Sequence, residues 1–261
     1  MTPVALTIAG SDPSGGAGIQ ADLKTFHQFG VYGEAVITLL TVQNTLRVSR
    51  IYCMTAKLVT EQLEAVMEDI PPRAAKTGAL GSASVVRAVA RAAVKFGFPL
   101  VVDPVIISKH GSPLLDDAAR EAMIRYLLPQ ATLVTPNLPE AEAIAGCRAG
   151  TMKERKEAAR RIAGLGSGSV LIKGGHGKGP AIDILFHQGR FIEFKSPRFN
   201  TAHTHGTGCT FSAAITACLA RGTALVESIV EAKGFITEAI RSNPGLGHGS
   251  GPVNHHAISA G

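Results

Sequence analysis

Short apolar segments alternate with helical patterns along most of the chain, and this order restricts the folds available to it. The apolar segments are rich in Val, Ile, Leu and Thr and occupy residues 4–10, 35–43, 74–80, 100–105, 132–137 and 169–175. Helical patterns occupy residues 17–29, 60–70, 82–97, 116–128, 139–146 and 152–166. Strands that are apolar on both faces and alternate with helices predict an α/β protein with a mainly parallel, doubly wound sheet.

The last third of the chain departs from this alternation. A hairpin is predicted over residues 183–194, and two helices follow it, one from the turn at 206–208 and one over 224–242. The 261 residues contain no recognisable linker, low-complexity tract or internal repeat. We therefore expect a single domain that covers residues 1–261.

Charge, cysteine spacing and hydrophobicity exclude several classes of protein. The net charge of +6 is spread along the chain and Trp is absent, so the sequence favours anionic small molecules over nucleic acid as partners. The four cysteines form no C-x-x-C pair, which indicates reduced thiols in a cytoplasmic protein. No apolar segment approaches the roughly 20 residues that a membrane span requires.

Polar residues follow the apolar part of each predicted strand. Asp12, Gln43, Asp103, Asn137 and Lys173 all occupy such positions. In an open α/β sheet these positions lie along one edge, where ligands bind beyond the carboxyl ends of the strands. One polar residue there would be an ordinary turn residue, but the series favours a ligand-binding rim.

The first of two glycine-rich turns has a loose dinucleotide-binding pattern. Residues 16–21 fit G-x-G-x-x-G/A, but residues 11–15 lengthen the loop between them and the first strand. The next predicted strand ends in Gln43 rather than an acid. A non-enzymatic NAD-binding sensor is therefore a weak alternative.

The second glycine-rich turn combines an anion site with a thiol. Gly206, Thr207 and Gly208 precede a helix, so their main-chain N–H groups and the helix dipole favour a bound anion. Cys209 follows at once. Packing, a redox thiol, a hydrolytic nucleophile and a proton acceptor are all open interpretations of this cysteine, although the sequence shows no triad partner for a hydrolase.

Several motifs in one order resemble a known family. The segments "TIAGSDPSGGAGIQADLKTF", "TVQNT", "VVDPV", "TPNLPEAE", "KGGH", "NTAHTHGTGCT" and "GHGSGPVNHH" are similar to those of the hydroxymethylpyrimidine/phosphomethylpyrimidine kinases of thiamine biosynthesis. The resemblance covers nearly the whole chain. It implies a ribokinase-like three-layer α/β/α sandwich, and the direct passage from the first strand to a helix leaves no room for the β-sheet lid of the sugar kinases.

The same resemblance implies an activity. It indicates ATP- and Mg²⁺-dependent phosphorylation of 4-amino-5-hydroxymethyl-2-methylpyrimidine (HMP), followed by phosphorylation of HMP phosphate, by a cytoplasmic enzyme that is often a homodimer. Pyridoxal kinase of the same superfamily is the nearest alternative, because pyridoxal also carries a hydroxymethyl group beside an aromatic nitrogen.

Residue roles follow from the matched motifs. Gly206, Thr207 and Gly208 would hold the transferred phosphoryl group, and Cys209 would be the base that takes the proton of the alcohol. The helix start is expected to lower the pKa of this thiol, whereas an incoming phosphate opposes that shift, so the resting protonation state of Cys209 is open. The implied substrate-binding residues are Gln43, Asp22, Gly10 and Leu80.

The remaining roles concern the nucleotide. Asp103 and Glu140 are expected to organise Mg²⁺, and Lys173, Asn137 and Asp103 to contact the nucleotide phosphates. Asn137 and Glu140 also match a helix-capping box. A flap is expected over residues 105–117, while His255 and His256 are expected in a frayed tail.

Overall fold

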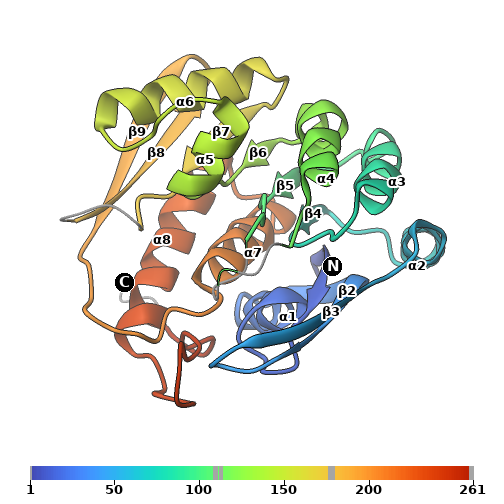
Figure 1. The fold of residues 1–261 in the computed structure, drawn as a ribbon, viewed down its shortest axis with the longest axis horizontal. Helices are drawn as coiled ribbons and strands as arrows, with labels where there is room; N and C mark the ends of the chain where they lie inside the picture. Colours follow the sequence, from blue (N-terminus) through green and yellow to red (C-terminus); the bar gives the residue numbers. More distant parts are fainter. Residues whose placement is uncertain (1, 108–110, 112–113, 176–179, 259–261) are drawn as a thin grey trace.

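The computed structural model describes residues 2–107, 111, 114–175 and 180–258. A sheet of nine strands runs through it in the order β3-β2-β1-β4-β5-β6-β7-β8-β9 (Figure 1). The strands are β1 Val4–Ser11, β2 Tyr32–Gln43, β3 Val48–Cys53, β4 Ala74–Thr77, β5 Leu100–Val102, β6 Leu133–Val134, β7 Ser169–Ile172, β8 Ala181–His187 and β9 Arg190–Ser196. In this spatial order, the neighbours in the central series β2-β1-β4-β5-β6-β7 all pair in parallel. Strand β3 pairs antiparallel with β2 at one edge, and β8 and β9 form antiparallel pairs at the other.

Eight α-helices accompany these strands in the described residues. They are α1 Gly18–Gln28, α2 Ala56–Asp69, α3 Ala83–Ala93, α4 Asp117–Ala122, α5 Leu138–Ala145, α6 Met152–Gly164, α7 Thr207–Ala220 and α8 Leu225–Arg241. The helix predicted over 116–128 changes its winding at Met123 to a π-helical turn, η1 Met123–Leu127, and then to a 3₁₀ turn, η2 Leu128–Gln130. Pro129 lies in that last turn, and its ring is incompatible with a continued α-helix.

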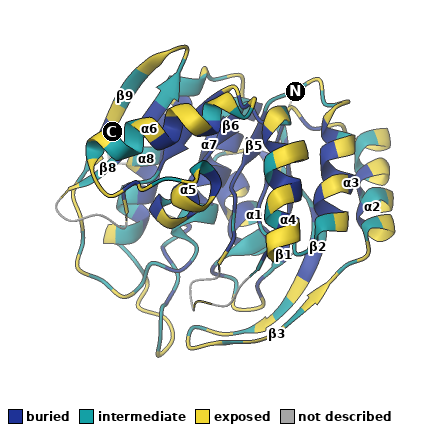
Figure 2. Ribbon diagram, turned by 45° about the horizontal axis from the view of Figure 1, so that its top comes forward, coloured by how far each residue is buried: buried dark blue, intermediate teal, exposed yellow. Residues whose placement is uncertain are grey.

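The helices form a layer on each side of the sheet. Helices α1, α7 and α8 pack on one face, around Phe26, Ile215 and Phe235. Helices α2 to α6 cover the other face, around Val86, Leu127 and Ile162. In Figure 2 the central strands carry the dark blue of buried residues, and the outer sides of α3 and α6 carry the yellow of exposed ones. The predicted three-layer sandwich with a mainly parallel sheet is confirmed.

The edge strand β3 was missed by the sequence analysis. It pairs with β2 from Leu39–Cys53 to Gln43–Val48, and the turn is built on Asn44, whose Oδ1 accepts from the N–H groups of Leu46 and Arg47. Its six residues are all at least partly exposed. An edge strand without a buried face lacks the hydrophobic signal from which strands are predicted. The hairpin extends the main sheet, and β1 leads into α1 through residues 12–17 without an inserted lid.

The segment after α8 folds back onto the sheet edge that holds the polar rim. The Ser250 N–H donates to the Thr45 carbonyl at 2.8 Å, and the His205 N–H donates to the Gly251 carbonyl at 3.0 Å. His255 is buried, with its Nε2 3.1 Å from Thr210 Oγ1. The expectation of a frayed tail at His255 is therefore wrong.

None of the helices in the described residues is long and apolar enough to cross a bilayer.

Candidate active site

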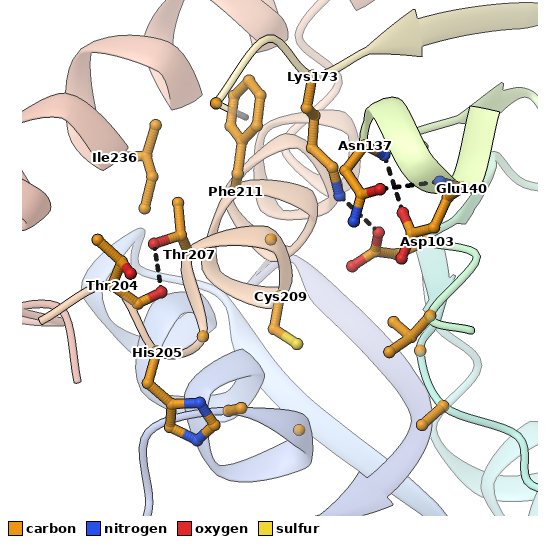
Figure 3. A pocket seen from close by; sticks show the side chains of 18 of the residues that line it. Asp103, Asn137, Glu140, Lys173, Thr204, His205, Thr207, Cys209, Phe211 and Ile236 are labelled. Carbon is orange, nitrogen blue, oxygen red and sulfur yellow. Dashed lines mark hydrogen bonds and ion pairs between the residues drawn. The ribbon is translucent and has the colours of Figure 1, made fainter. Parts of the chain in front are cut away.

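A cavity of about 600 Å³ opens at the carboxyl ends of the parallel strands. Its lining includes most of the residues that the sequence analysis singled out: Gly10, Gln43, Asp103, Asn137, Glu140, Lys173, Gly206, Thr207, Gly208 and Cys209. Figure 3 shows the Cys209 thiol between a cluster formed by Asp103, Asn137, Glu140 and Lys173 and the turn that carries Thr204 and His205. The predicted rim is thus assembled in one cavity.

The two glycine-rich turns pack against each other. Gly206 has φ +77°, and a Cβ atom there would collide with the carbonyl oxygen of Gly16. A Cβ atom at Gly16 would in turn lie 2.6 Å from His205 Cδ2. Glycine is required at Gly206 because only glycine combines a left-handed backbone with such close approach, and Gly16 has no room for a side chain beside His205.

A side-chain hydrogen bond joins the same two turns. His205 Nε2 lies 2.7 Å from Asp12 Oδ2, across 193 positions of sequence. Asp12 also accepts from the N–H groups of Ser14 and Ala17. Burial would raise the pKa of Asp12, but hydrogen bonds from His205, Ser14 and Gln43 prevail and lower it to about 2. The sequence analysis placed Asp12 on the rim but missed its pairing with His205.

The start of α7 forms a cradle for an anion. The first N–H groups of a helix have no carbonyl partner within it, and here they belong to Thr207, Gly208 and Cys209. The Thr207 N–H donates to the Thr204 carbonyl at 3.3 Å, so Gly208 and Cys209 are the main donors of the cradle. A Cβ atom at Gly208 would lie 3.2 Å from Lys173 Nζ and 3.7 Å from Asp103 Oδ2. The missing side chain therefore lets a lysine ammonium approach the helix start, and both attract a phosphoryl group.

Lys173 is held in place by a carboxylate. Its Nζ is 2.8 Å from Asp103 Oδ1, and both side chains are largely buried. Ser212 Oγ and Thr135 Oγ1 each donate to Asp103 at 3.3 Å. Burial would lower the pKa of Lys173, but Asp103 and Glu140 raise it, so the ammonium stays charged.

Glu140 is the second carboxylate of this cluster. Its Oε2 accepts from the N–H of Asn137 at 2.8 Å, while Asn137 Oδ1 accepts from the N–H of Glu140 at 2.9 Å. This is the capping box of α5. Burial raises the pKa of Glu140 to about 7, against the opposing effect of Lys173 and with a further increase from Asp103.

The arrangement of these oxygens suits a magnesium ion that is shared with phosphates. The described residues contain no group of three or more His, Cys, Asp or Glu side chains that could hold a metal. Mg²⁺ bound together with a nucleotide needs only one or two carboxylates, because phosphates and water supply the other ligands. Asp103 and Glu140 act on each other electrostatically, which shows that the two carboxylates lie close together, and beside the anion cradle of α7 they fit such an ion.

Cys209 lines the cavity with its side chain partly exposed. Burial raises the pKa of this thiol to about 12, with Asp22 and Asp103 adding to the increase and Lys76 opposing it. The expectation that the helix start lowers this pKa is wrong for the protein without ligands. Desolvation in a protein interior outweighs the effect of the helix terminus.

Two predicted substrate residues lie behind the cavity wall. Asp22 is fully buried, pairs with Lys76 Nζ at 2.8 Å and accepts from Thr7 Oγ1 at 2.6 Å. Leu80 is 2% exposed and belongs to the hydrophobic core. Neither is among the lining residues, so the structure does not support direct contact of Asp22 or Leu80 with a ligand.

The expected flap lies partly outside the described residues. On either side of that gap, Ile106, Ile107 and Leu114 line the cavity. The opposite end of the cavity is also apolar, with Phe211, Ile236 and Ile240 in its lining.

A protein-family model matches most of the chain. The phosphomethylpyrimidine kinase family model matches residues 12–254. Among curated proteins, the hydroxymethylpyrimidine/phosphomethylpyrimidine kinase of Bacillus subtilis is 44% identical over 257 residues, which covers 97% of this chain and 95% of that protein.

Solved structures of two kinds of vitamin kinase resemble the chain. The phosphomethylpyrimidine kinase of Clostridium difficile has a TM-score of 0.82 and 45% identity and covers 92% of this chain and 100% of its own. An ADP complex of Bacillus subtilis pyridoxal kinase has a TM-score of 0.92 and 38% identity over 98% of both chains.

Proposed function

Because the chain belongs to the phosphomethylpyrimidine kinase family, we propose that it transfers the γ-phosphoryl group of ATP first to the hydroxymethyl group of HMP and then to HMP phosphate, for thiamine biosynthesis. The ribokinase-like fold expected from the motifs is confirmed by the same relatives. Sequence identity favours this activity over that of a pyridoxal kinase, since the pyrimidine kinases are 44% and 45% identical and the pyridoxal kinase 38%.

One observation carries the proposal. The N-terminus of α7, the ammonium of Lys173 and the thiol of Cys209 lie together in a cavity that also holds Asp103 and Glu140. This set supplies the requirements of phosphoryl transfer, which are charge neutralisation, alignment and a group near the attacking hydroxyl.

The parts of the cavity suggest where each reactant lies. The apolar end at Phe211, Ile236 and Ile240 suits the adenine ring, and the cradle at Thr207 and Gly208 then receives the phosphates. When bound between Asp103, Glu140 and the phosphates, Mg²⁺ would neutralise charge on the departing nucleotide. Asn137 can contribute its amide without leaving its capping position.

The pyrimidine has a separate place at the other side of Cys209. Gln43 lines the cavity near the end of β2, and its side chain hydrogen-bonds Asp12. An amide offers both a donor and an acceptor to an aminopyrimidine edge. Gly10 lines the same region, and its missing side chain makes room for Leu39, since a Cβ atom there would lie 2.5 Å from Leu39 Cδ1.

A turnover assay tests the proposal. The protein is incubated with ATP, Mg²⁺ and HMP, and the products are followed by mass. We expect HMP phosphate first and HMP diphosphate later, with pyridoxal phosphorylated more slowly at equal concentration. Faster turnover of pyridoxal would make the chain a pyridoxal kinase, and no phosphorylated product would refute kinase activity.

We further propose a cytoplasmic homodimer. Strand β3 is a free edge of the sheet, and the hairpin that it forms with β2 exposes Leu40, Val42 and Tyr52. An exposed apolar edge favours association. Light scattering should give twice the mass of the 27.1 kDa chain, and a monomeric mass would contradict the proposal.

A further inference from the structure

An ion pair lies in the wall of the cavity, and the reaction described above does not use it. Lys233 on α8 and Asp183 on β8 both line the cavity, and Lys233 Nζ lies 2.6 Å from Asp183 Oδ2. Only 12% of the lysine side chain and 4% of the aspartate side chain are exposed. Removing two charges from water is unfavourable, and such a pair is weak evidence for stability. Its place in a ligand cavity therefore indicates a role in binding.

The carboxylate of this pair holds its surroundings in place. Asp183 Oδ1 accepts from the N–H of Gly174 at 2.7 Å, while Oδ2 holds the ammonium of Lys233. Gly174 directly follows Lys173, and its carbonyl accepts from Arg198 at 3.2 Å. Because both oxygens of Asp183 are engaged, the carboxylate orients neighbouring groups and leaves ligand binding to the lysine.

The ammonium of Lys233 retains capacity for a further hydrogen bond. It carries three N–H donors, and among the described residues its hydrogen-bond acceptor is Asp183. The ring centroid of Phe211 lies 6.0 Å from Nζ, a distance at which a cation is attracted to an aromatic face but forms no hydrogen bond with it. Since the side chain is largely buried, water has little access to the other donors. A ligand in the cavity can therefore accept a hydrogen bond from Lys233.

The neighbours of this ammonium suit a flat ring. Lys233, Ile236 and Ile240 line the cavity from one face of α8, at helical spacing. In Figure 3, Phe211 and Ile236 lie on one side of Lys173, and the two carboxylates that fit Mg²⁺ lie on the other. The lysine thus belongs to the apolar end of the cavity, where the adenine ring is proposed to bind.

Charge also distinguishes this pair from the phosphate cradle. Lys233 lies in the middle of α8, away from the positive end of that helix, and Asp183 neutralises it. A carboxylate so close to the ammonium repels a phosphate. A neutral ion pair in apolar surroundings instead suits an uncharged acceptor, such as a ring nitrogen of adenine.

We propose that Lys233 recognises the base of the phosphoryl donor: its ammonium, held by Asp183, donates a hydrogen bond to a ring nitrogen of adenine. The inference rests on the proposed function and adds the selection of the nucleotide to it. The apolar lining accepts any flat ring, whereas a fixed donor favours rings that present an acceptor at the matching edge. Lys233 is therefore a specificity-determining residue for the nucleotide.

Analogues of ADP that lack one ring nitrogen test the proposal without any change to the protein. In 1-deaza-, 3-deaza- and 7-deaza-ADP, a C–H group replaces one acceptor at nearly unchanged size. The dissociation constant of each analogue is measured by calorimetry in the presence of Mg²⁺. We expect at least one of them to bind wild type about tenfold more weakly than ADP, as for the loss of a hydrogen bond to a charged group.

A variant assigns this loss to Lys233. Lys233→Met removes the ammonium and keeps an unbranched side chain. We expect ADP to bind it about tenfold more weakly, and the sensitive analogue to bind it as well as ADP does, because both have then lost the same hydrogen bond. The matched control is Lys195→Met, since Lys195 is exposed on β9 and does not line the cavity. It should preserve both the affinity for ADP and the weaker binding of the analogue.

A second variant removes the risk that an unpaired carboxylate prevents folding. Lys233→Met/Asp183→Asn leaves no charge at the pair and keeps an acceptor for the N–H of Gly174. It should also bind the sensitive analogue as well as ADP. Each comparison is made between two ligands of the same protein, so a general loss of affinity cancels.

The outcomes separate the inference from the function on which it rests. Wild type that binds all three analogues as tightly as ADP would overturn the inference, and so would an analogue loss that is as large in the Lys233 variants as in wild type. Either result would leave the transfer to HMP, followed by product mass, unaffected. Wild-type protein that phosphorylates neither HMP nor HMP phosphate would instead refute the proposed function, and the binding of ADP and its analogues would still decide the role of Lys233.

Discussion

At the scale of single residues, Cys209 is subject to opposing influences. It sits at a helix start beside two lysines, yet burial raises its pKa to about 12 in the protein without ligands. Its thiol is therefore protonated at neutral pH, and the negative form arises only at a cost in free energy. A residue of this kind serves a slow, protected transfer better than a freely reactive nucleophile would.

Replacing the thiol tests its role as base. We expect Cys209→Ala to bind a non-hydrolysable ATP analogue nearly as well as wild type, because the cradle consists of main-chain N–H groups. Turnover of HMP should fall by about 10²-fold or more, within the range for a positioned base. The control is Cys218→Ala on the same helix, where the thiol is buried away from the cavity lining. Near-normal turnover of Cys209→Ala would eliminate the base assignment.

Glu140 makes magnesium binding sensitive to pH. Its pKa is raised to about 7, so below that pH its carboxyl is protonated and must release the proton before it can bind a cation. Calorimetry of Mg²⁺ with an ATP analogue, in buffers of different ionisation enthalpy, should show release of up to about one proton near pH 6 and little at pH 8. Affinity for the metal complex should rise over the same interval.

The control lies on the same helix. Glu140→Gln should abolish the proton release and weaken binding, whereas the exposed neighbour Glu142 can be changed to Gln without either effect. Proton release that persists in Glu140→Gln would assign the titrating group elsewhere.

At the scale of elements, helices α5 and α6 both begin with a capping box, but only that of α5 lies in the cavity. Asn137 and Glu140 form the capping box of α5 in the cavity, and Thr151 and Glu154 form that of α6 outside the cavity lining. Variants of the two N-caps can therefore distinguish the contribution of an N-cap to folding stability from its contribution to ligand binding.

We expect Asn137→Ala and Thr151→Ala each to lower the free energy of unfolding by about 1 kcal/mol, the usual cost of losing an N-cap. Only Asn137→Ala should also lower kcat, because only Asn137 lines the cavity in which the phosphates are proposed to bind. Urea unfolding and a turnover assay on both variants measure the two effects. Equal activity in the two variants would leave Asn137 as a cap alone.

Sequence patterns predicted most elements and most of the cavity, for identifiable reasons. Continuous apolar segments reveal buried strands such as β1 and β5, and residues such as Asp103 and Lys173 follow such strands directly. The pairs were not predictable: Lys76–Asp22 spans 54 positions and His205–Asp12 spans 193. Such contacts depend on tertiary packing, which no local spacing encodes. Asp22 was assigned to the substrate from the family resemblance, and its pairing with Lys76 on β4 was not predicted.

At the scale of the whole molecule, the segment after α8 supports the site from behind, because none of its described residues lines the cavity but several contact His205, which does. Residues 251–253 form a bridge with His205, which in turn contacts Asp12 on the opposite turn. His255 packs on α7 at Thr210. Burial, together with Lys24, His256 and His205, lowers the pKa of His255 to about 4.

This shift predicts that acid destabilises the docked segment. The folded pKa lies below the ordinary value of 6.5, so the unfolded chain binds a proton that the native state does not, and stability falls as pH decreases through that interval. Urea unfolding of wild type should lose up to about 1.4 kcal/mol per pH unit between pH 6 and 5 from this group. His255→Gln should lack that part of the slope, and His256→Gln, which alters an exposed neighbour, should retain it. Identical slopes in wild type and His255→Gln would contradict the assignment.

The bridge between His205 and residues 251–253 has a consequence for biosynthesis. On the ribosome, the nascent polypeptide can assemble its strands and hydrophobic layers well before residue 250 has emerged from the exit tunnel. Until then, the turn before Cys209 would lack the hydrogen bonds that His205 makes with Gly251 and Val253. The newborn chain should therefore acquire most of its architecture first and its competence for chemistry only once residues 251–253 have been made.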